Sequence, residues 1–332
     1  MVVNRNRREL LAASLESVVR SARAAGVELE LAVVDNGSRD GSAAMVSERF
    51  PAADVLALDV NVGFPAAVNL AVARTSAEWI LLLNNDATLD RNALGHLLEA
   101  TSAPDVGAIA AQQRFAARPD LINSAGIGID VLGVAYDRLL GAPVDASEPD
   151  YTDVFGASAG AALYRRAMLD QVGGFDPRFF VYLEDVDLAW RARMAGWRTL
   201  YAPRAVAWHH HASTARHGSP FKYFHVGRNR VRMLARNADR RHLRRRGAAI
   251  VAYDLAYVAF VAARERSIAP LLGRLAGLRE WRSYRREGAS LRRPVSLEPR
   301  RGLRAALRRR AAWAQGGTNP RDGPTPARPG WR

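Results

Sequence analysis

The chain has 332 residues, 48% of them hydrophobic, and no cysteine; this composition is ordinary for a globular protein and excludes disulfides and thiolate metal sites. Residues 1–235 carry 24 basic and 26 acidic side chains, whereas residues 236–332 carry 24 arginines and 7 acidic side chains. We therefore expect a nearly neutral globular body followed by a strongly cationic region, with no signal peptide in front of the body.

The chain begins like an α/β protein. A very short apolar start, residues 1–3, precedes residues 9–23, whose apolar positions have helical spacing. Residues 29–34 are predicted to form a buried strand that ends abruptly at Asp35. A carboxylate at a strand end is placed to accept hydrogen bonds from a nucleotide base or ribose. The alternative is an ordinary turn or helix-capping residue, a role that Asp also favours.

Two further strands are predicted to end in polar residues. Residues 55–58 lead through Gly63, which lets the backbone approach a ligand closely, into a helix. Residues 78–83 form the most apolar strand, and Asn84, Asn85 and Asp86 follow it. Oxygen ligands at the end of a buried strand suit Mg²⁺ or Mn²⁺, which completes its shell with substrate phosphates and water. A plain Asn/Asp turn is the alternative.

The middle of the chain carries weaker patterns. Residues 106–111 and 156–164 are predicted to be strands, and the small residues of the second leave room for a ligand or for tight packing. Residues 115–153 are predicted to be rich in loops and to form an insertion that faces the substrate.

Three carboxylates gather where strand-like sequence gives way to a helix. Glu184, Asp185 and Asp187 follow an aromatic and apolar run, and the helix after them is predicted to end at Gly196. Ligands of open α/β sheets bind at such an edge, although acidic residues also favour the first turn of any helix. Asp187 lies four positions before Arg191, which is the spacing of a helical ion pair.

A run of three histidines follows the last strands that are predicted in the body. Residues 197–201 and 205–208 are predicted to be short strands, and the second leads into His209, His210 and His211. Neutral imidazole is a common metal ligand, and a surface cluster that binds metal without catalytic use is the alternative.

Six motifs occur together and in order: residues 33–42 (VVDNGSRDGS), 61–64 (NVGF), 83–86 (LNND), 173–176 (GGFD), 184–191 (EDVDLAWR) and 209–211 (HHH). As a set they resemble the GT-A glycosyltransferases of family 2, and especially their bacterial rhamnosyltransferase-like branch, over residues 1–235. The resemblance implies an α/β GT-A fold, a Rossmann-like nucleotide-binding sandwich with a mostly parallel central sheet. It also implies an inverting transfer from a nucleoside-diphosphate sugar that depends on Mg²⁺ or Mn²⁺.

The resemblance assigns roles by position. It makes Asp185 the base that activates the acceptor hydroxyl, with Glu184 beside it, and it makes Asp86 a metal ligand together with His209 or His211. The residues that it assigns to the nucleotide sugar are Asp35, Asn36, Ser38, Asn61, Gly63, Asn69, Asn84 and Asn85. The sequence departs from the family pattern at four places. Asn84 stands where the family's D-x-D motif has its first Asp, and Arg5 stands where an aromatic residue is usual. The first strand is nearly absent, and Leu70 stands where a small residue is expected after Asn69.

The region after residue 235 is predicted to be a basic helical appendage. Residues 247–263 are apolar except for Asp254, whose cost at the centre of a bilayer, about 2.5–3.5 kcal/mol, nearly cancels the gain from the apolar residues. We therefore expect a helix that packs on the body or lies on a membrane, not a span. Residues 236–313 are predicted to form basic amphipathic helices and residues 314–332 a disordered tail.

Clustered arginines beside amphipathic helices suit an anionic membrane surface, and a solvated helical face in an arginine-rich chain is the alternative. The expected place is cytoplasmic, on the inner face of the plasma membrane, with a glycan or lipid-linked acceptor used in cell-envelope polysaccharide synthesis. Two competing functions are a sugar nucleotidyltransferase and a nucleic-acid-binding protein acting through the cationic region. No nucleic acid partner is expected, because no known binding motif accompanies the charge.

Overall fold

The computed structural model describes residues 1–210, 219–288 and 294–299. In chain order, the strands are β1 (Val2–Asn4), β2 (Ala32–Asn36), β3 (Asp54–Leu58), β4 (Trp79–Asn84), β5 (Ala87–Leu89), β6 (Val106–Phe115), β7 (Arg118–Ser124), β8 (Ile127–Ile129), β9 (Ala135–Asp137), β10 (Thr152–Val154), β11 (Ala161–Arg165) and β12 (Arg198–His209). The α-helices are α1 (Arg8–Ala25), α2 (Ser42–Arg49), α3 (Phe64–Val72), α4 (Ala93–Glu99), α5 (Arg166–Val172), α6 (Glu184–Ala195), α7 (Pro220–Asn237), α8 (Arg240–Glu265), α9 (Ala269–Arg279) and α10 (Trp281–Glu287). Short 3₁₀ turns are η1 (Ala100–Ser102), η2 (Val144–Ala146) and η3 (Pro177–Phe179).

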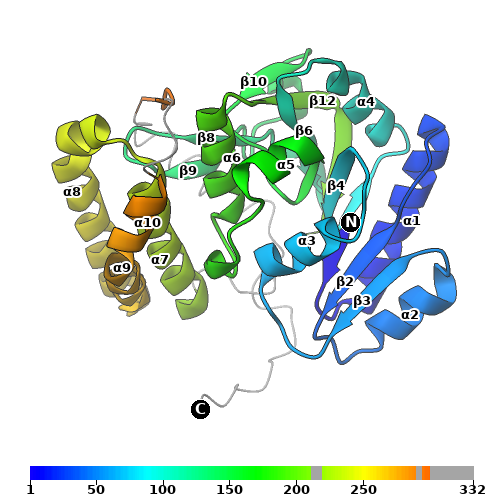
Figure 1. Cartoon of the computed structure of the whole chain (residues 1–332), viewed down its shortest axis with the longest axis horizontal. Helices are drawn as coiled ribbons and strands as arrows, with labels where there is room; N and C mark the ends of the chain where they lie inside the picture. Colours follow the sequence, from blue (N-terminus) through cyan, green and yellow to red (C-terminus); the bar gives the residue numbers. More distant parts are fainter. Residues whose placement is uncertain (211–218, 289–293, 300–332) are drawn as a thin grey trace.

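One large mixed sheet forms the centre of the molecule (Figure 1). Its strand order is β10-β12-β6-β11-β4-β1-β2-β3, with β5 paired to β12 and β7 paired to β6. The half made of β4, β1, β2 and β3 is entirely parallel, whereas β11 joins it to β6 by antiparallel pairing. This is the α/β architecture that the sequence predicts.

The very short first strand lies in the middle of the parallel half. Val2 pairs with Val33 of β2 on one side and with Leu83 of β4 on the other. Three residues are therefore enough to form a stable strand, because both neighbouring strands supply hydrogen bonds and Val2 is only 1% exposed. All three strands carry their carboxyl ends to the same edge of the sheet.

Helices cover both faces of the sheet, because the side chains of a strand alternate between faces. Val33 and Leu83 face a core that is completed by Leu11 and Leu15 of α1. On the opposite face, Leu82 packs with side chains of α3, α5 and α6. The sheet is thus the middle of three layers.

The region between residues 115 and 153 differs from the loop-rich insertion that the sequence predicts. It contains β7, which pairs with β6, a small separate sheet of β8 and β9, and β10 at the sheet edge. The two strands expected at 197–201 and 205–208 are one strand, β12, with an irregularity between Ala202 and Val206. Of the predicted strand at 156–164, residues 161–164 belong to β11.

The C-terminal helices α7 to α10 form one side of the molecule (Figure 1). Helices α7 and α9 pack very closely, since a side chain at Gly273 would clash with the carbonyl oxygen of Phe224, and one at Gly277 would come within 2.7 Å of that of Arg228. Tyr284 of α10 shares a core with Phe179. The predicted domain boundary after residue 235 falls inside α7, whose last residues remain in contact with the body.

Candidate active site

The carboxyl ends of β1 and β2 hold a buried polar cluster around Asp35. The Nδ2 atom of Asn4 donates to Asp35 Oδ1 at 3.2 Å and to Ser38 Oγ at 3.3 Å, and the Ser38 hydroxyl donates to the same carboxylate. Asp35 is 5% exposed. The hydrogen bonds fix the carboxylate at the sheet edge, where ligands of open α/β sheets bind.

A second set of amides shapes the turn before α3. Asn36 Nδ2 donates to Asn61 Oδ1 at 2.9 Å, and Asn36 Oδ1 accepts from the amide of Val62 at 2.8 Å. Gly63 has a φ of 88°, and a side chain there would come within 2.7 Å of the carbonyl oxygen of Phe180. This loop therefore requires glycine and touches the segment that leads to Glu184.

The end of β4 lies beside the Asp35 cluster. Asn85 Nδ2 donates to Asn4 Oδ1 at 2.6 Å, which joins β4 to the Asp35 cluster. The backbone amide of Asn84 donates to the carbonyl oxygen of Gly160 at 2.9 Å. Neighbouring Ala159 donates its backbone amide to Asp185 Oδ2 at 3.3 Å. One short path of hydrogen bonds and peptide links thus connects β4 to the acidic cluster.

Asp86 and His209 face each other across β5 and β12. Their Oδ1 and Nε2 atoms are 3.1 Å apart, and His209 Nδ1 lies 3.0 Å from Asn123 Oδ1 on β7. If Nδ1 donates to that amide oxygen, Nε2 of the neutral ring is an acceptor that faces a carboxylate. A cation between two such acceptors is a favourable arrangement, and carboxylate with imidazole is a donor set that Mn²⁺ accepts.

These two residues fit a metal that takes its remaining ligands from elsewhere. Among the described residues, no group of three or more His, Asp or Glu side chains gathers around one point. His210 is exposed, with its backbone amide bonded to the carbonyl oxygen of Asp86 at 2.8 Å. His211 lies outside the described residues.

Glu184 and Asp185 begin α6 directly after a loop with strained backbone. Phe180, Tyr182 and Leu183 have φ values of 66°, 71° and 66°. For side chains other than glycine this left-handed region costs on the order of 1–3 kcal/mol each. Such strain persists where the surroundings hold it in place, which occurs most often at functional sites.

The two carboxyl groups are held in a low-polarity environment. Asp185 Oδ1 accepts from the backbone amide of Val186 at 2.8 Å, and Oδ2 accepts from Ala159. Glu184 Oε2 is buried and has no hydrogen-bond partner among the described residues. Burial raises the pKa of Glu184, and the charge of Asp185 raises it further. Burial also raises the pKa of Asp185, against the two backbone hydrogen bonds. A carboxylate with a raised pKa is a stronger base at neutral pH.

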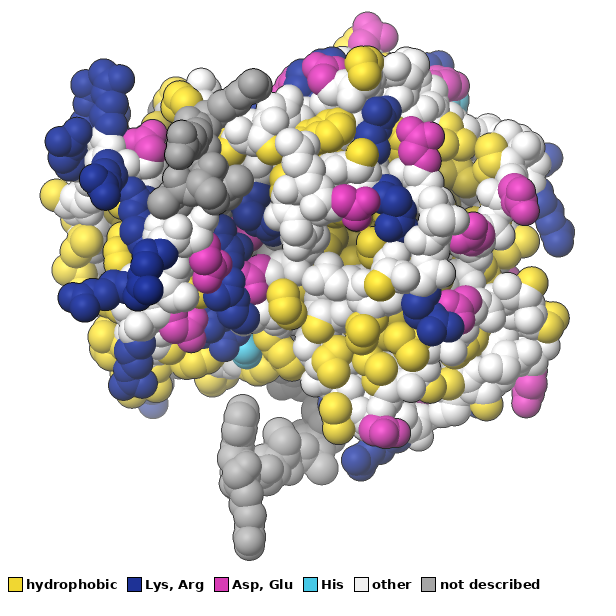
Figure 2. Space-filling view, viewed as in Figure 1, with side chains coloured by type: hydrophobic (Ala, Val, Ile, Leu, Met, Phe, Trp, Pro, Cys, Tyr) yellow, Lys and Arg dark blue, Asp and Glu magenta, His cyan; other side chains and the backbone are white. Residues whose placement is uncertain are grey.

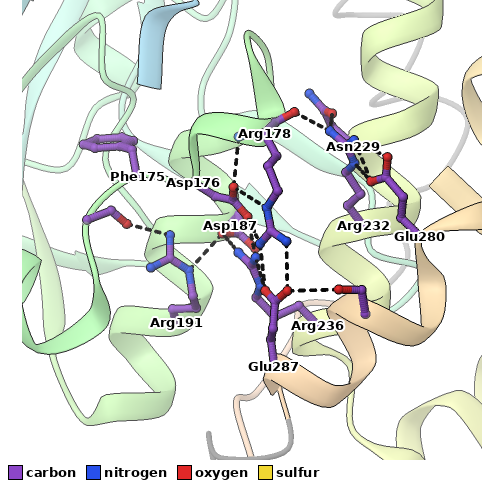
Figure 3. A network of polar contacts seen from close by, with 12 residues as sticks. Phe175, Asp176, Arg178, Asp187, Arg191, Asn229, Arg232, Arg236, Glu280 and Glu287 are labelled. Atoms are coloured by element: carbon purple, nitrogen blue, oxygen red, sulfur yellow. Dashed lines mark hydrogen bonds and ion pairs between the residues drawn. The ribbon is translucent and has the colours of Figure 1, made fainter. Parts of the chain in front are cut away.

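Asp187 has a different environment from its neighbours. It is fully buried and accepts from Arg191 Nε and from Arg236 Nη1, both at 2.8 Å, and from Asn237 Nδ2 at 2.8 Å (Figure 3). The ion pair with Arg191, predicted from the spacing, is confirmed. Asp187 therefore joins α6 to the end of α7.

Asn69 lies apart from the other candidates for nucleotide-sugar binding. Its Oδ1 atom accepts from the amide of Phe175 at 3.1 Å, and its Nδ2 atom donates to the carbonyl oxygen of Phe175 at 2.6 Å. The structure brings the other seven candidates to the end of β1, β2 and β4, and it connects Asn69 instead to the loop before η3.

Sequence reasoning missed three polar residues: Asn4, Asn123 and Asn229. The Nδ2 atom of Asn229 donates to the carbonyl oxygens of Val181 and Tyr182, in the loop before Glu184. Asn4 ends a strand of only three residues, and Asn123 lies in the region predicted to be loops. Asn229 lies eighteen positions after the last residue of the histidine run, and no local sequence pattern marks it. Only Asn4 could have been found from the sequence, because it directly follows the first apolar residues, where a strand end is expected.

The chain is similar in sequence to known proteins of one enzyme family. A model of the family described as "Glycosyltransferase like family 2" matches residues 1–232. The N-acetylglucosaminyl-diphospho-decaprenol L-rhamnosyltransferase of Mycobacterium tuberculosis is 33% identical over 209 residues, which cover 55% of this chain and 67% of that protein. The O-antigen chain rhamnosyltransferase RfbN of Salmonella typhimurium is 28% identical and is covered to 62% of its length, with 60% of this chain aligned.

Solved structures share the fold at low sequence identity. The mannosyltransferase PcManGT of Pyrobaculum calidifontis, in complex with GDP-Man and Mn²⁺, superposes with a TM-score of 0.52 at 19% identity, over 87% of this chain and 83% of that chain. GalNAc-T7 with UDP, GalNAc and Mn²⁺ gives a TM-score of 0.58 at 14% identity, over 71% of this chain and 47% of that chain.

The family model covers well over half of the chain, and the central sheet has the strand arrangement expected of the GT-A fold. The chain therefore belongs to glycosyltransferase family 2, and it is a glycosyltransferase.

Proposed function

We propose that this enzyme transfers a sugar from a nucleoside-diphosphate sugar to a hydroxyl group of a glycan or lipid-linked acceptor, with inversion at the anomeric carbon. The observation that carries the proposal is the path from β4 to α6: Asn84 bonds to Gly160, and Ala159 beside it bonds to Asp185. This path supports the proposal, because it connects the strand end proposed for donor binding with the proposed base.

Donor binding would use the polar cluster at that edge. Asp35, held by Asn4 and Ser38, is oriented to accept hydrogen bonds from a base or ribose. The turn made by Asn36, Asn61 and Gly63 offers backbone close to the ligand. Asn84 and Asn85 would contact the donor from the end of β4.

Asp86 and His209 are the residues that would hold Mg²⁺ or Mn²⁺. A divalent cation held by these two residues would supply positive charge against the negative charge of the departing diphosphate. The solved relatives with bound Mn²⁺ support the choice of a divalent ion. Asn123 orients the imidazole, since it contacts the ring nitrogen that does not face Asp86.

Asp185 would accept the proton of the acceptor hydroxyl as the oxygen attacks the anomeric carbon. The bond from oxygen to carbon forms on the side opposite the leaving diphosphate, so one displacement inverts the configuration. Burial raises the pKa of Asp185, which suits a general base near neutral pH. Glu184 would orient the acceptor next to it.

The names of the relatives suggest the acceptor. The Mycobacterium tuberculosis relative is named for the transfer of L-rhamnose to a decaprenol-linked diphospho-sugar, and RfbN for rhamnose transfer to the O-antigen chain. We accordingly propose rhamnose as the sugar and a cell-envelope polysaccharide or its lipid-linked precursor as the acceptor.

The test is a screen of UDP-, dTDP- and GDP-sugars for thermal stabilisation with Mn²⁺ or Mg²⁺ present. Donors that stabilise the protein are then incubated with lipid-linked and free glycan acceptors, and the anomeric configuration of the product is determined. We expect stabilisation by one nucleotide class and an inverted product. Retention of configuration would refute the single displacement.

We also propose that the enzyme works at an anionic membrane surface. Of the twelve large apolar side chains that are exposed among the described residues, eight lie between positions 251 and 278: Val251, Leu255, Phe260, Ile268, Leu271, Leu272, Leu275 and Leu278. Basic side chains gather over the same helices (Figure 2). Apolar surface next to clustered arginine is the composition of an interfacial helix on anionic lipid.

The one acidic residue in the apolar part of α8, Asp254, does not face the proposed membrane surface. Asp254 accepts from Arg230 Nε at 2.8 Å and from Arg274 Nη2 at 2.7 Å, so it is directed toward α7 and α9. By length and composition alone α8 is also able to cross a membrane. Ion pairs to two neighbouring helices favour a helix that lies on the membrane with Asp254 facing the protein.

A further inference from the structure

The loop from Phe179 to Leu183 is held from two sides. On one side, the carbonyl oxygen of Phe180 accepts from the backbone amide of Phe64 at 2.8 Å, next to the turn proposed for donor binding. On the other side lies Asn229 of α7, which is completely buried. Its Nδ2 atom is 2.9, 2.9 and 2.8 Å from the carbonyl oxygens of Phe179, Val181 and Tyr182.

The orientation of the Asn229 amide follows from its other contacts. Its Oδ1 atom accepts from Arg228 Nε at 3.2 Å and from Arg232 Nη1 at 3.4 Å. Guanidinium groups only donate hydrogen bonds, so the oxygen must face them and the NH₂ group must face the loop. Arg228 adds a bond from Nη2 to the carbonyl oxygen of Phe179 at 2.9 Å.

Helix α7 is itself fixed in place. A side chain at Gly227 would come within 2.8 Å of the carbonyl oxygen of Pro270, so α7 and α9 are in backbone contact at the turn before Asn229. Arg232 donates to both carboxylate oxygens of Glu280, at 2.6 and 2.7 Å (Figure 3). The donors of Asn229 are thus presented from a rigid helix.

We propose that Asn229 is a positioning residue: by holding three carbonyl groups of the strained loop, it sets where α6 begins and so where Glu184 and Asp185 lie. The inference rests on the proposed function for the role of Asp185. Without the Asn229 donors, nothing else in the described contacts holds the carbonyls of Val181 and Tyr182. The left-handed residues would then relax, and the start of α6 would move.

The sharpest variant is Asn229→Asp. It keeps the size of the side chain and gains attraction to Arg228 and Arg232, but it places carboxylate oxygen against the loop carbonyls. Asn229→Ala removes the donors without adding repulsion. The matched control is Arg230→Met, because Arg230 is also buried in α7 but binds the carbonyls of Leu132 and Gly133, far from the loop in sequence.

Three measurements are made on each variant: turnover, donor affinity, and hydrogen–deuterium exchange of residues 176–190 in the free protein. For both Asn229 variants we expect about a 10²-fold loss of kcat, as for a misplaced catalytic group, little change in donor affinity, and faster exchange of the loop. For Arg230→Met we expect normal kcat and exchange even if the melting temperature falls.

Unchanged exchange in both Asn229 variants would overturn the proposal, and so would a loss of turnover no larger than that of Arg230→Met at equal stability. Asp185→Asn is measured in parallel. If that variant stays active while the Asn229 variants lose turnover and loop protection, the positioning role stands and the assignment of the base is wrong.

Discussion

Asp185 and Asp187 lie two positions apart on α6, yet their carboxylates have opposite surroundings. Asp187 is fully buried and accepts charge-assisted hydrogen bonds from Arg191 and Arg236. Asp185 is half-buried and accepts from the backbone amides of Ala159 and Val186. Positions two apart on a helix point in different directions, so one acidic motif serves both the fold and the proposed chemistry.

This difference predicts opposite phenotypes for two identical substitutions. Asp185→Asn should lower turnover by ~10²–10⁴, because the amide cannot accept a proton, and should leave the melting temperature nearly unchanged. Asp187→Asn should instead destabilise the fold by about 3–5 kcal/mol, because buried Arg191 loses its carboxylate partner and Arg236 loses one of its three. Single-turnover rates and thermal melts of both variants provide the check. An active Asp185→Asn enzyme would falsify the assignment of the base.

Metal dependence is predicted to reside in Asp86 and His209. EDTA should weaken the binding of nucleoside diphosphate, and added Mn²⁺ should restore it. In the Asp86→Asn variant, added Mn²⁺ should not restore the binding of nucleoside diphosphate. Asn123→Ala, which frees the imidazole, should cost roughly 10–100-fold in metal affinity. Calorimetric titration of nucleoside diphosphate measures these effects.

His210→Gln is the matched control for the metal prediction, because its side chain is exposed next to His209. It should bind metal and donor normally. Equal donor affinity with and without EDTA, together with full activity in EDTA, would contradict the assignment.

The pH profile of kcat/KM should show an acid limb well above the ordinary aspartate range, around 3.9. The base works as the carboxylate, so activity is lost as the pH falls through its pKa. Burial raises the pKa of Asp185, and the charge of Asp137 on β9 also raises it. The charge of Asp185 in turn raises the pKa of Glu184 and of Tyr164.

Removing the charge of Asp137 should shift the acid limb of the pH profile in a defined direction. Asp137→Asn should move the acid limb to lower pH, since a neutral side chain no longer opposes ionisation of Asp185. Rate measurements across pH 4–8, about the range in which shifted carboxyl groups titrate, are the test. A limb that stays in place, or moves upward, would show that another group controls it.

Membrane association should depend on the apolar side chains of α8 and α9. The double variant Leu255→Gln with Leu272→Gln should lose binding to vesicles that contain anionic phospholipid, because both side chains are exposed, at 62% and 47%. Val27→Gln, exposed on the body at 38%, is the control and should bind normally. Co-sedimentation at low and high salt measures both contributions, since salt screens the arginines. Indifference to anionic lipid would refute this prediction.

The sequence predicts those parts of the fold that depend on neighbouring residues. The strand ending at Asn84 is recognisable because it is continuously apolar and is followed by polar residues. The pair of Asp187 with Arg191 follows from helical spacing alone. These features need no knowledge of distant segments.

The features that sequence reasoning missed depend on contacts between distant segments. Strand β7 is partly polar and exists because it pairs with β6, so its residues look like loop. Asn229 contacts a loop nearly fifty positions earlier, and no local pattern marks it. Asn123 similarly contacts His209 from a strand that the pattern does not reveal.

The ion network between the body and the C-terminal helices limits how the enzyme can be divided. Arg236 binds Asp187 and Asp176, and Glu287 of α10 binds both Arg236 and Arg178 (Figure 3). A fragment cut after residue 235 would keep Asp176 and Asp187 but lose the Arg236 guanidinium that both share. The cationic helices are therefore not an exchangeable module. A hybrid that grafts them from a relative must keep the acidic partners on the body as well, or α6, which carries Glu184 and Asp185, will lose the ion pairs that support it.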